Sequence, residues 1–195
     1  MRILQIGCGG IGSYLIQEIS ECIEQGQINP YTKITIADND IAEIDQLKYQ
    51  NFNIDEVGQT KAKTLAIRYA DSGIQAINNR ITKEEQLKNY DVIILCVDNE
   101  RTREKVIQYC HKYGKEFIDL RATGRRLFAM PKEATLEMNM KYVDSQDMNE
   151  YSCQDQADLD KEFIQKGNKI VAMIGVQMLL NLLRGHNNKI ISMVV

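Results

Sequence analysis

The stretch ILQIGCGGIGSYLIQEI, residues 3–19, decides how the fold of this chain begins. A short apolar run meets four glycines within six residues, and apolar residues then recur at helical spacing. Gly7, Gly9 and Gly12 fit the pattern G-x-G-x-x-G between an expected strand and an expected helix. There, glycine permits a tight turn and a close phosphate, and the helix N-terminus offers unpaired N–H groups. The stretch predicts a nucleotide-phosphate loop, but it does not distinguish NAD, FAD and ATP.

Strands and helices alternate along the chain on the C-terminal side of this loop. We expect strands at residues 2–6, 33–37, 74–81, 91–97 and 116–120, and helices from Ile11, over 60–69 and over 100–113. In the run DVIILCV at 91–97, every residue after Asp91 is apolar, as is typical of a strand buried on both faces. This alternation predicts an α/β, Rossmann-like, mainly parallel sheet with helices on both faces.

The pattern changes after residue 124. The stretch RRLFAMPKEATLEM, 125–138, predicts two antiparallel strands around Pro131, and the polar residues 139–160 predict a long crossover loop. A helix is expected over 161–184, ended by Gly185, with a last strand at 189–195. At 195 residues, we expect one nucleotide-binding domain over 1–195.

Composition narrows the class of protein and its compartment. The net charge of -3 gives no basic surface for nucleic acid, and no apolar stretch is long enough to span a membrane. The first ten residues do not resemble a signal peptide, because glycines interrupt them. The five cysteines are odd in number and lack C-x-x-C spacing, which argues against a disulfide framework or a four-cysteine zinc site. We therefore expect a cytoplasmic protein.

The residues after the glycine loop carry a more specific pattern. The full loop reads G-x-G-G-x-G, with Gly10 as the additional glycine, and Asp38 and Asp40 form D-x-D after the second strand. The sequence continues with QLKYQ at 46–50, then V-G-x-x-K-A from Val57 to Ala62, and Asp98-Asn99 followed by Arg103. Together these motifs resemble the ubiquitin-activating-enzyme-like superfamily of ThiF, MoeB and HesA adenylyltransferases, in its compact ThiF-like branch. The resemblance covers nearly the whole chain.

The resemblance implies a reaction and a set of site residues. ATP would bind with its phosphates at the glycine loop, and the C-terminal glycine of a small ubiquitin-like or sulfur-carrier protein would attack the α-phosphate. Asp38 would bind the ribose, Lys61 the phosphates, and Asp98 a Mg²⁺ ion. The resemblance also assigns residues to two wider groups. The nucleotide-binding group adds Asp40, Lys48, Gln50 and Asn99 to these, and the catalytic group is Lys61, Asp98 and Arg103. No zinc is expected, because the paired-cysteine zinc motif of the family is missing.

Several of these residues have a second interpretation. Lys61 can be a solvated helix lysine, Asp98 can cap the helix that starts near Glu100, and Arg103 can pair with a helix neighbour. Cys153 lies in the polar loop, where some family members carry a cysteine that forms a thioester or persulfide; the alternative is a structural thiol. These alternatives stay open at the level of sequence.

One departure from the family pattern bears on activity. The family motif N-L-x-R-Q has an arginine where this chain has Tyr49, and tyrosine brings no positive charge. The candidate replacements are Lys48, Arg103, Arg121, Arg125 and Arg126, or a partner subunit. Three classes of function follow: an adenylating enzyme, a degenerate nucleotide-binding scaffold, and a nicotinamide or flavin oxidoreductase.

The expected C-terminal helix bears on assembly. Apolar residues from Ile170 to Leu183 cover nearly all its sides, so the helix must be buried all round. In a chain of this size we expect a homodimer to cover part of that surface, unless the chain's own sheet covers it all.

Overall fold

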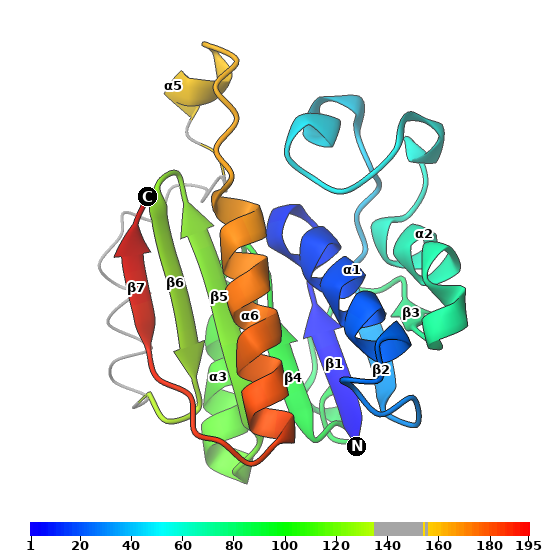
Figure 1. The fold of residues 1–195 in the computed structure, drawn as a ribbon, viewed down its shortest axis with the longest axis vertical. Coiled ribbons are helices and arrows are strands. Elements are labelled where there is room, and N and C mark those ends of the chain that lie inside the picture. Colours follow the sequence, from blue (N-terminus) through cyan, green and yellow to red (C-terminus); the bar gives the residue numbers. More distant parts are fainter. Residues whose placement is uncertain (135–153, 155) are drawn as a thin grey trace.

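The computed structural model describes residues 1–134, 154 and 156–195, arranged around one central sheet (Figure 1). The strands are β1 (Arg2–Ile6), β2 (Lys33–Ala37), β3 (Gln75–Ile77), β4 (Val92–Leu95), β5 (Glu116–Thr123), β6 (Arg126–Pro131) and β7 (Ile191–Val194). The α-helices are α1 (Gly10–Glu24), α2 (Lys61–Arg68), α3 (Glu100–Tyr113), α5 (Gln156–Leu159) and α6 (Gly167–Leu183). Short 3₁₀ helices lie at Ile44–Lys48, Ile54–Glu56, Ala70–Ser72 and Glu84–Gln86.

The seven strands follow the order β3-β2-β1-β4-β5-β6-β7. Strands β1 to β5 run parallel to one another, and β6 and β7 are added as antiparallel strands at one edge. Because β1 pairs with both β2 and β4, the chain reverses its direction of progress across the sheet at β1. Ligands of open α/β sheets bind at such a switch point, outside the carboxyl ends of the strands. The glycine loop after β1 lies there.

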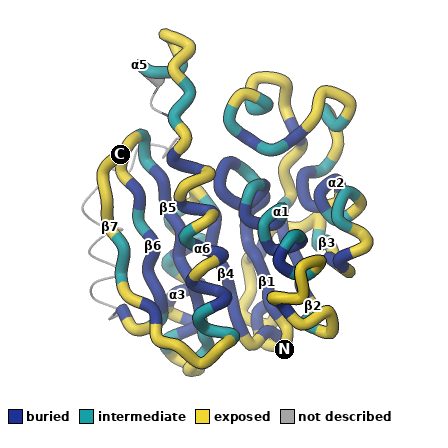
Figure 2. Tube along the Cα trace, viewed as in Figure 1, coloured by how far each residue is buried: buried dark blue, intermediate teal, exposed yellow. Residues whose placement is uncertain are grey.

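Helices cover both faces of the sheet. Ile3 of β1 packs in a core cluster with side chains of α1, α2 and α6, whereas Leu4 packs in a second cluster with side chains of α3. The central strands are therefore buried on both faces (Figure 2), which explains the uninterrupted apolar run at 92–97. The expected α/β Rossmann-like fold, with antiparallel strands after the parallel ones, is confirmed.

Three elements differ most from their predicted bounds. Strand β3 ends at Ile77, because the polar residues 78–80 leave the sheet edge for solvent. Strand β5 continues to Thr123, because Arg121 forms an ion pair with Asp119 and can therefore lie inside a buried strand. Helix α6 begins at Gly167 rather than at 161. Strand β6 is the first of the two strands expected around Pro131, and the second lies outside the described residues, as does most of the 139–160 loop.

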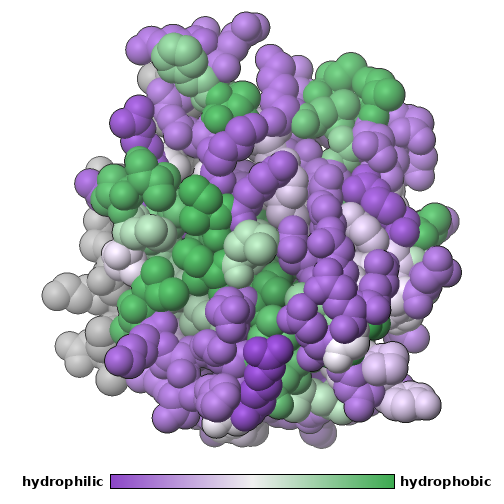
Figure 3. Space-filling model, viewed as in Figure 1, coloured by the Kyte–Doolittle hydropathy of each residue, from purple (hydrophilic) through white to green (hydrophobic). Residues whose placement is uncertain are grey.

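Helix α6 packs against α1, β5 and β6, but one side of it faces outward. Met173 is 52% exposed and Ile170 36%, and Met193 of the adjacent edge is 39% exposed. Apolar residues gather over α6 and the β6–β7 edge in Figure 3. The chain's own sheet therefore covers part of this helix and leaves an apolar strip. Across the described residues, no α-helix is long and apolar enough to cross a bilayer.

Candidate functional site

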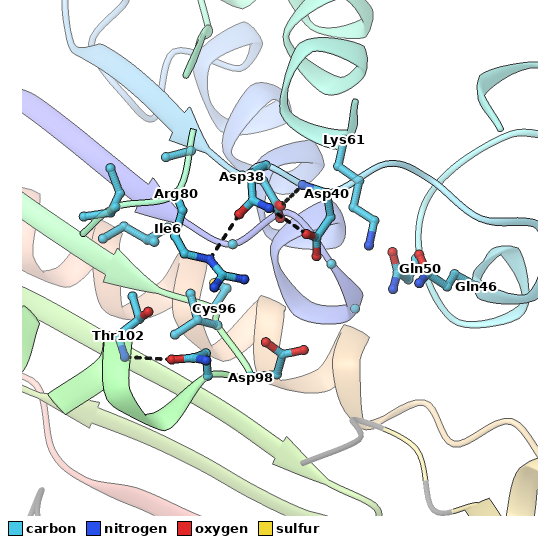
Figure 4. A pocket seen from close by; sticks show the side chains of 18 of the residues that line it. Ile6, Asp38, Asp40, Gln46, Gln50, Lys61, Arg80, Cys96, Asp98 and Thr102 are labelled. Carbon is cyan, nitrogen blue, oxygen red and sulfur yellow. Dashed lines mark hydrogen bonds between the residues drawn. The ribbon is translucent and has the colours of Figure 1, made fainter. Parts of the chain in front are cut away.

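A pocket of about 220 Å³ opens at the carboxyl ends of β1, β2 and β4 (Figure 4). It brings together nine of the residues that the sequence predicts for a nucleotide site. These are Gly7, Gly9, Gly10, Asp38, Asp40, Gln50, Lys61, Asp98 and Asn99. Three other predicted residues, Gly12, Lys48 and Arg103, do not line it. Cys153 lies outside the described residues.

The glycine loop is held in a tight turn by its neighbours. Gly7 has φ +96°, and a Cβ added there would lie 2.5 Å from the carbonyl oxygen of Cys96, so only glycine fits. The buried Gln5 amide donates from Nε2 to the Gly7 oxygen at 3.0 Å and the Gly12 oxygen at 2.9 Å. Gln5 was not predicted, although a glutamine inside an apolar strand was its signal. Gly12 therefore does not line the pocket, and its carbonyl oxygen helps to hold the glycine loop through Gln5.

Asp38 ties the end of β2 to the glycine loop. One carboxylate oxygen accepts from the Cys8 N–H at 2.7 Å, and the other accepts from the Asp40 N–H at 2.8 Å. Burial raises the pKa of the Asp38 carboxyl, while the two backbone N–H groups and Lys61 act in the opposite direction. A carboxylate offers about four lone-pair sites, so Asp38 keeps acceptors for further donors in the pocket.

Lys61 lies at the start of α2, and its backbone N–H bonds to the Asp40 oxygen at 2.9 Å. The residue is only 4% exposed, and its ammonium group points into the pocket between Asp40 and Gln50 (Figure 4). It makes no ion pair with any described residue. The interpretation as a solvated helix lysine is therefore wrong. A largely buried cation without a carboxylate partner is arranged to meet an anion that enters from outside.

Asp98 and Asn99 follow β4 and have different roles. The Asn99 side chain caps α3 by accepting from the Thr102 N–H at 2.9 Å. The sequence alternative in which Asp98 is the cap is therefore wrong. Asp98 is exposed in the pocket and makes no hydrogen bond or ion pair with a described residue. The described residues hold no group of three or more His, Cys, Asp or Glu side chains suited to a metal ion.

Arg103 lies behind the pocket, in the protein interior. It is 3% exposed, it pairs with Asp119 and Glu100, and it donates to the carbonyl oxygen of Val97. The expected pairing with a helix neighbour is thus confirmed through Glu100. Burial alone would lower the pKa of the guanidinium, but the charges of Asp119 and Glu100 outweigh it, so the pKa is raised. Arg103 fixes the backbone just before Asp98.

The cations around the pocket differ from those expected. Of the five named replacements for the family arginine, none lines the pocket, whereas Tyr49 itself does. Arg80 is a lining cation that the sequence analysis missed, and its Nε donates to the Asn39 side chain at 3.4 Å. It was assigned to a strand over 74–81, and only the early end of β3 brings it to the pocket. The position after a parallel strand was the signal that could have found it.

Two buried cysteines, Cys8 of the glycine loop and Cys110 of α3, are not set up as nucleophiles. Burial, and then the Asp38 charge, raise the pKa of the Cys8 thiol well above its usual range. Cys110 is on the buried side of α3, where burial raises its pKa to about 12. Because the thiolate is the reactive form, these thiols are inert near neutral pH.

Structures of E. coli MccB are among the solved structures that resemble this chain in shape. E. coli MccB with ATP has a TM-score of 0.69 and 16% identity, and the match covers 100% of this chain and 60% of that one. E. coli MccB with AMPCPP and selenomethionine MccA has a TM-score of 0.67 and 15% identity, covering 99% and 63%. This chain thus spans less than two thirds of those chains, and at such identity the likeness shows a shared fold.

The sequence itself matches a family over almost its entire length. A search of curated proteins finds no significant match. The match to the ThiF family covers residues 1–194 and therefore includes the glycine loop, Lys61, Asp98 and the C-terminal strands. On this evidence, the chain belongs to the ThiF family.

Proposed function

We propose that this protein uses ATP to adenylate the terminal carboxylate of a peptide or small protein. The proposed substrate class is a small ubiquitin-like or sulfur-carrier protein with a C-terminal glycine. The observation that carries the proposal is Lys61, a cation 4% exposed and without a described ion-pair partner, whose ammonium enters a pocket edged by the glycine loop. Such a cation needs an anionic partner, and the triphosphate of ATP would supply one. Membership in the ThiF family supports the same reaction.

The pocket divides into parts that match the parts of ATP. The phosphates would lie over Gly9, where an added Cβ would meet only the Gln50 amide, at 3.8 Å, and would be met by Lys61. The ribose hydroxyls would donate to the free lone pairs of Asp38. Asp98 would hold Mg²⁺, which binds through one or two carboxylates plus phosphate oxygens and neutralises phosphate charge. Asp40 and Asn99 border the same space.

The chemistry then needs little from the protein beyond positioning. The substrate carboxylate attacks the α-phosphorus, the bond to the bridging oxygen breaks, and an acyl-adenylate and pyrophosphate form. Lys61 stabilises charge on the phosphates, and Arg103 keeps the Val97–Asp98 backbone in place. No protein nucleophile takes part, which fits the protonated state of Cys8. None of the four described cysteines forms a disulfide with another described residue. We also propose a cytoplasmic location.

ATP should bind more tightly than NAD. The lysine and carboxylate of the pocket suit a triphosphate with its metal, whereas a dinucleotide pyrophosphate brings fewer negative charges to Lys61. Calorimetric titration with Mg²⁺ATP and with NAD measures the two affinities directly. Tighter binding of NAD would contradict the proposal and favour an oxidoreductase. ATP–pyrophosphate exchange, with and without a carrier protein ending in glycine, then tests the reaction.

A degenerate nucleotide-binding scaffold is the second candidate, and Tyr49 favours it. Tyr49 lines the pocket where the family pattern has an arginine, so triphosphate charge is neutralised less completely. In a slow enzyme, we expect Tyr49→Arg to raise the rate of pyrophosphate exchange by up to about a hundredfold, the usual size of one such contact. Tyr31→Arg is the matched control, because Tyr31 is 87% exposed. A protein that binds ATP but stays inactive after Tyr49→Arg, with a carrier present, would be a scaffold.

We also propose that the protein is a homodimer through the α6 strip, defined as Ile170, Met173 and Met193. Light scattering at micromolar concentration should give the mass of two chains. Met173→Asp should yield monomers, because it puts an unpaired charge into an apolar interface. Ile67→Asp is the control, since Ile67 is 63% exposed on α2, away from the strip. A monomeric wild-type protein would contradict this assembly.

A further inference from the structure

The start of α6 touches the glycine loop directly. Asn168, the second residue of α6, is 1% exposed, and its amide lies beside Gly10. A Cβ added at Gly10 would lie 2.4 Å from Nδ2 and 3.3 Å from Oδ1 of Asn168. The glycine at position 10 therefore makes room for this amide, in addition to any role toward phosphate.

The same amide also bonds to a second segment that lines the pocket, at Tyr49. Asn168 Nδ2 donates to the carbonyl oxygen of Tyr49 at 3.3 Å, across 119 positions of sequence. Its Oδ1 is buried and accepts no hydrogen bond from the described residues. Tyr49 and Gln50 line the pocket beside the glycine loop, with the Gln50 amide 3.8 Å from a Cβ added at Gly9. One buried side chain thus spans the two segments that border the space proposed for the phosphates.

The chain that leads into α6 is itself fixed. Gln154 is 1% exposed, and its amide makes two hydrogen bonds to the backbone of Gln165, at 3.1 and 2.9 Å. A Cβ added at Gly167 would lie 2.8 Å from the Leu127 side chain, so α6 begins in close contact with β6. The start of α6 is therefore held in place, and with it the Asn168 side chain that contacts Gly10 and Tyr49.

We propose that Asn168 is a positioning residue of the nucleotide site, which sets the spacing between the glycine loop and the Tyr49–Gln50 segment. This inference rests on the proposed function, because it assigns Asn168 a role in ordering the site for ATP. Asn168 does not line the pocket, so it acts through Gly10 and Tyr49. The start of a helix does not by itself require an amide side chain at its second residue. The hydrogen bond to the Tyr49 carbonyl oxygen does require a donor there, and the Asn168 amide supplies it.

The test compares two substitutions at Asn168 with a control on the exposed side of α6. Asn168→Asp keeps the shape but replaces the N–H donor with an acceptor facing the Tyr49 carbonyl, and Asn168→Ala removes the whole amide. Gln177→Ala is the control. Mg²⁺ATP affinity, pyrophosphate exchange and the midpoint of thermal unfolding are measured for each. We expect both Asn168 variants to lose roughly tenfold or more in ATP affinity or exchange, the effect of one buried hydrogen bond. The control should match the wild type.

A second pair of variants tests the contact with Gly10 independently of nucleotide. Gly10→Ala should lower the unfolding midpoint, because its methyl group collides with the Asn168 amide. In the Asn168→Ala background, the same change should cost much less, so the two effects are not additive.

The outcomes separate the two claims. Additive unfolding effects, or an Asn168→Ala variant within twofold of the wild type in affinity and exchange, would overturn the positioning role. A wild-type protein that binds no nucleotide would instead refute the proposed function, and the positioning role with it.

Discussion

Replacing Lys61 with glutamine should lower the rate of ATP–pyrophosphate exchange by about 100- to 1000-fold. This corresponds to roughly 2.7–4 kcal/mol, the range for losing one preorganised group that stabilises transition-state charge. Lys61 brings its ammonium into the pocket from a side chain that is 4% exposed, so water cannot readily replace it. Exchange assays at saturating Mg²⁺ATP, with a carrier substrate, measure the effect.

The fold should survive this change, because Lys61 makes no described ion pair that the substitution would break. Its backbone N–H bond to Asp40 is retained in the variant. Lys63→Gln is the matched control, since Lys63 lies two positions along α2 and is exposed. We expect Lys63→Gln to exchange at the wild-type rate. Equal losses in both variants would indicate a general effect of charge rather than a role for Lys61 in the pocket.

Replacing Asp98 with asparagine should lower the affinity for Mg²⁺ in the ATP complex by at least about 10- to 100-fold. Losing an outer-shell partner of a metal ligand costs about this much, and Asp98 is proposed as a direct ligand. The substitution keeps the side-chain volume and removes the charge that attracts the cation. Since Asn99 caps α3, the helix should remain intact. Titration of ATP at several Mg²⁺ concentrations, with and without chelator, gives the measurement.

Asn99→Ala separates capping from metal binding. It removes the acceptor for the Thr102 N–H, so it should lower the free energy of unfolding by about 1 kcal/mol. Its effect on magnesium dependence should be small beside that of Asp98→Asn. If Asp98→Asn leaves the magnesium dependence unchanged, another group must hold the metal, and the role proposed for Asp98 is wrong.

Local sequence patterns predicted the central part of this protein well. The bounds of β1, β2 and α3 agree with those expected, because each is set by a nearby periodicity or a cap. Gly7, Gly9, Gly10 and Asp38 line one pocket, as expected from their places after neighbouring parallel strands, since the carboxyl ends of such strands meet at one edge of the sheet.

The errors and omissions share one cause, which is contact between distant segments. The predicted strand 116–120 stopped before Arg121, yet in the fold Arg121 lies within β5 and pairs with Asp119. Arg80 and Gln5 received no role, because their partners Asn39 and Gly12 are related to them only through the sheet and the loop. The sequence analysis offered Asp98 as a cap of α3, and only the structure showed that Asn99 is the cap.

The sequence by itself determined the order of strands and helices along the chain, the glycine loop and the membership in the ThiF family. Those features depend on backbone conformations and periodicities that neighbouring residues impose. Only the tertiary structure decided that Lys61 is a buried cation facing the pocket, that Arg103 lies behind it, and that Asn168 packs on Gly10. Burial and ion pairing are properties of segments that are far apart in sequence, so local patterns cannot specify them.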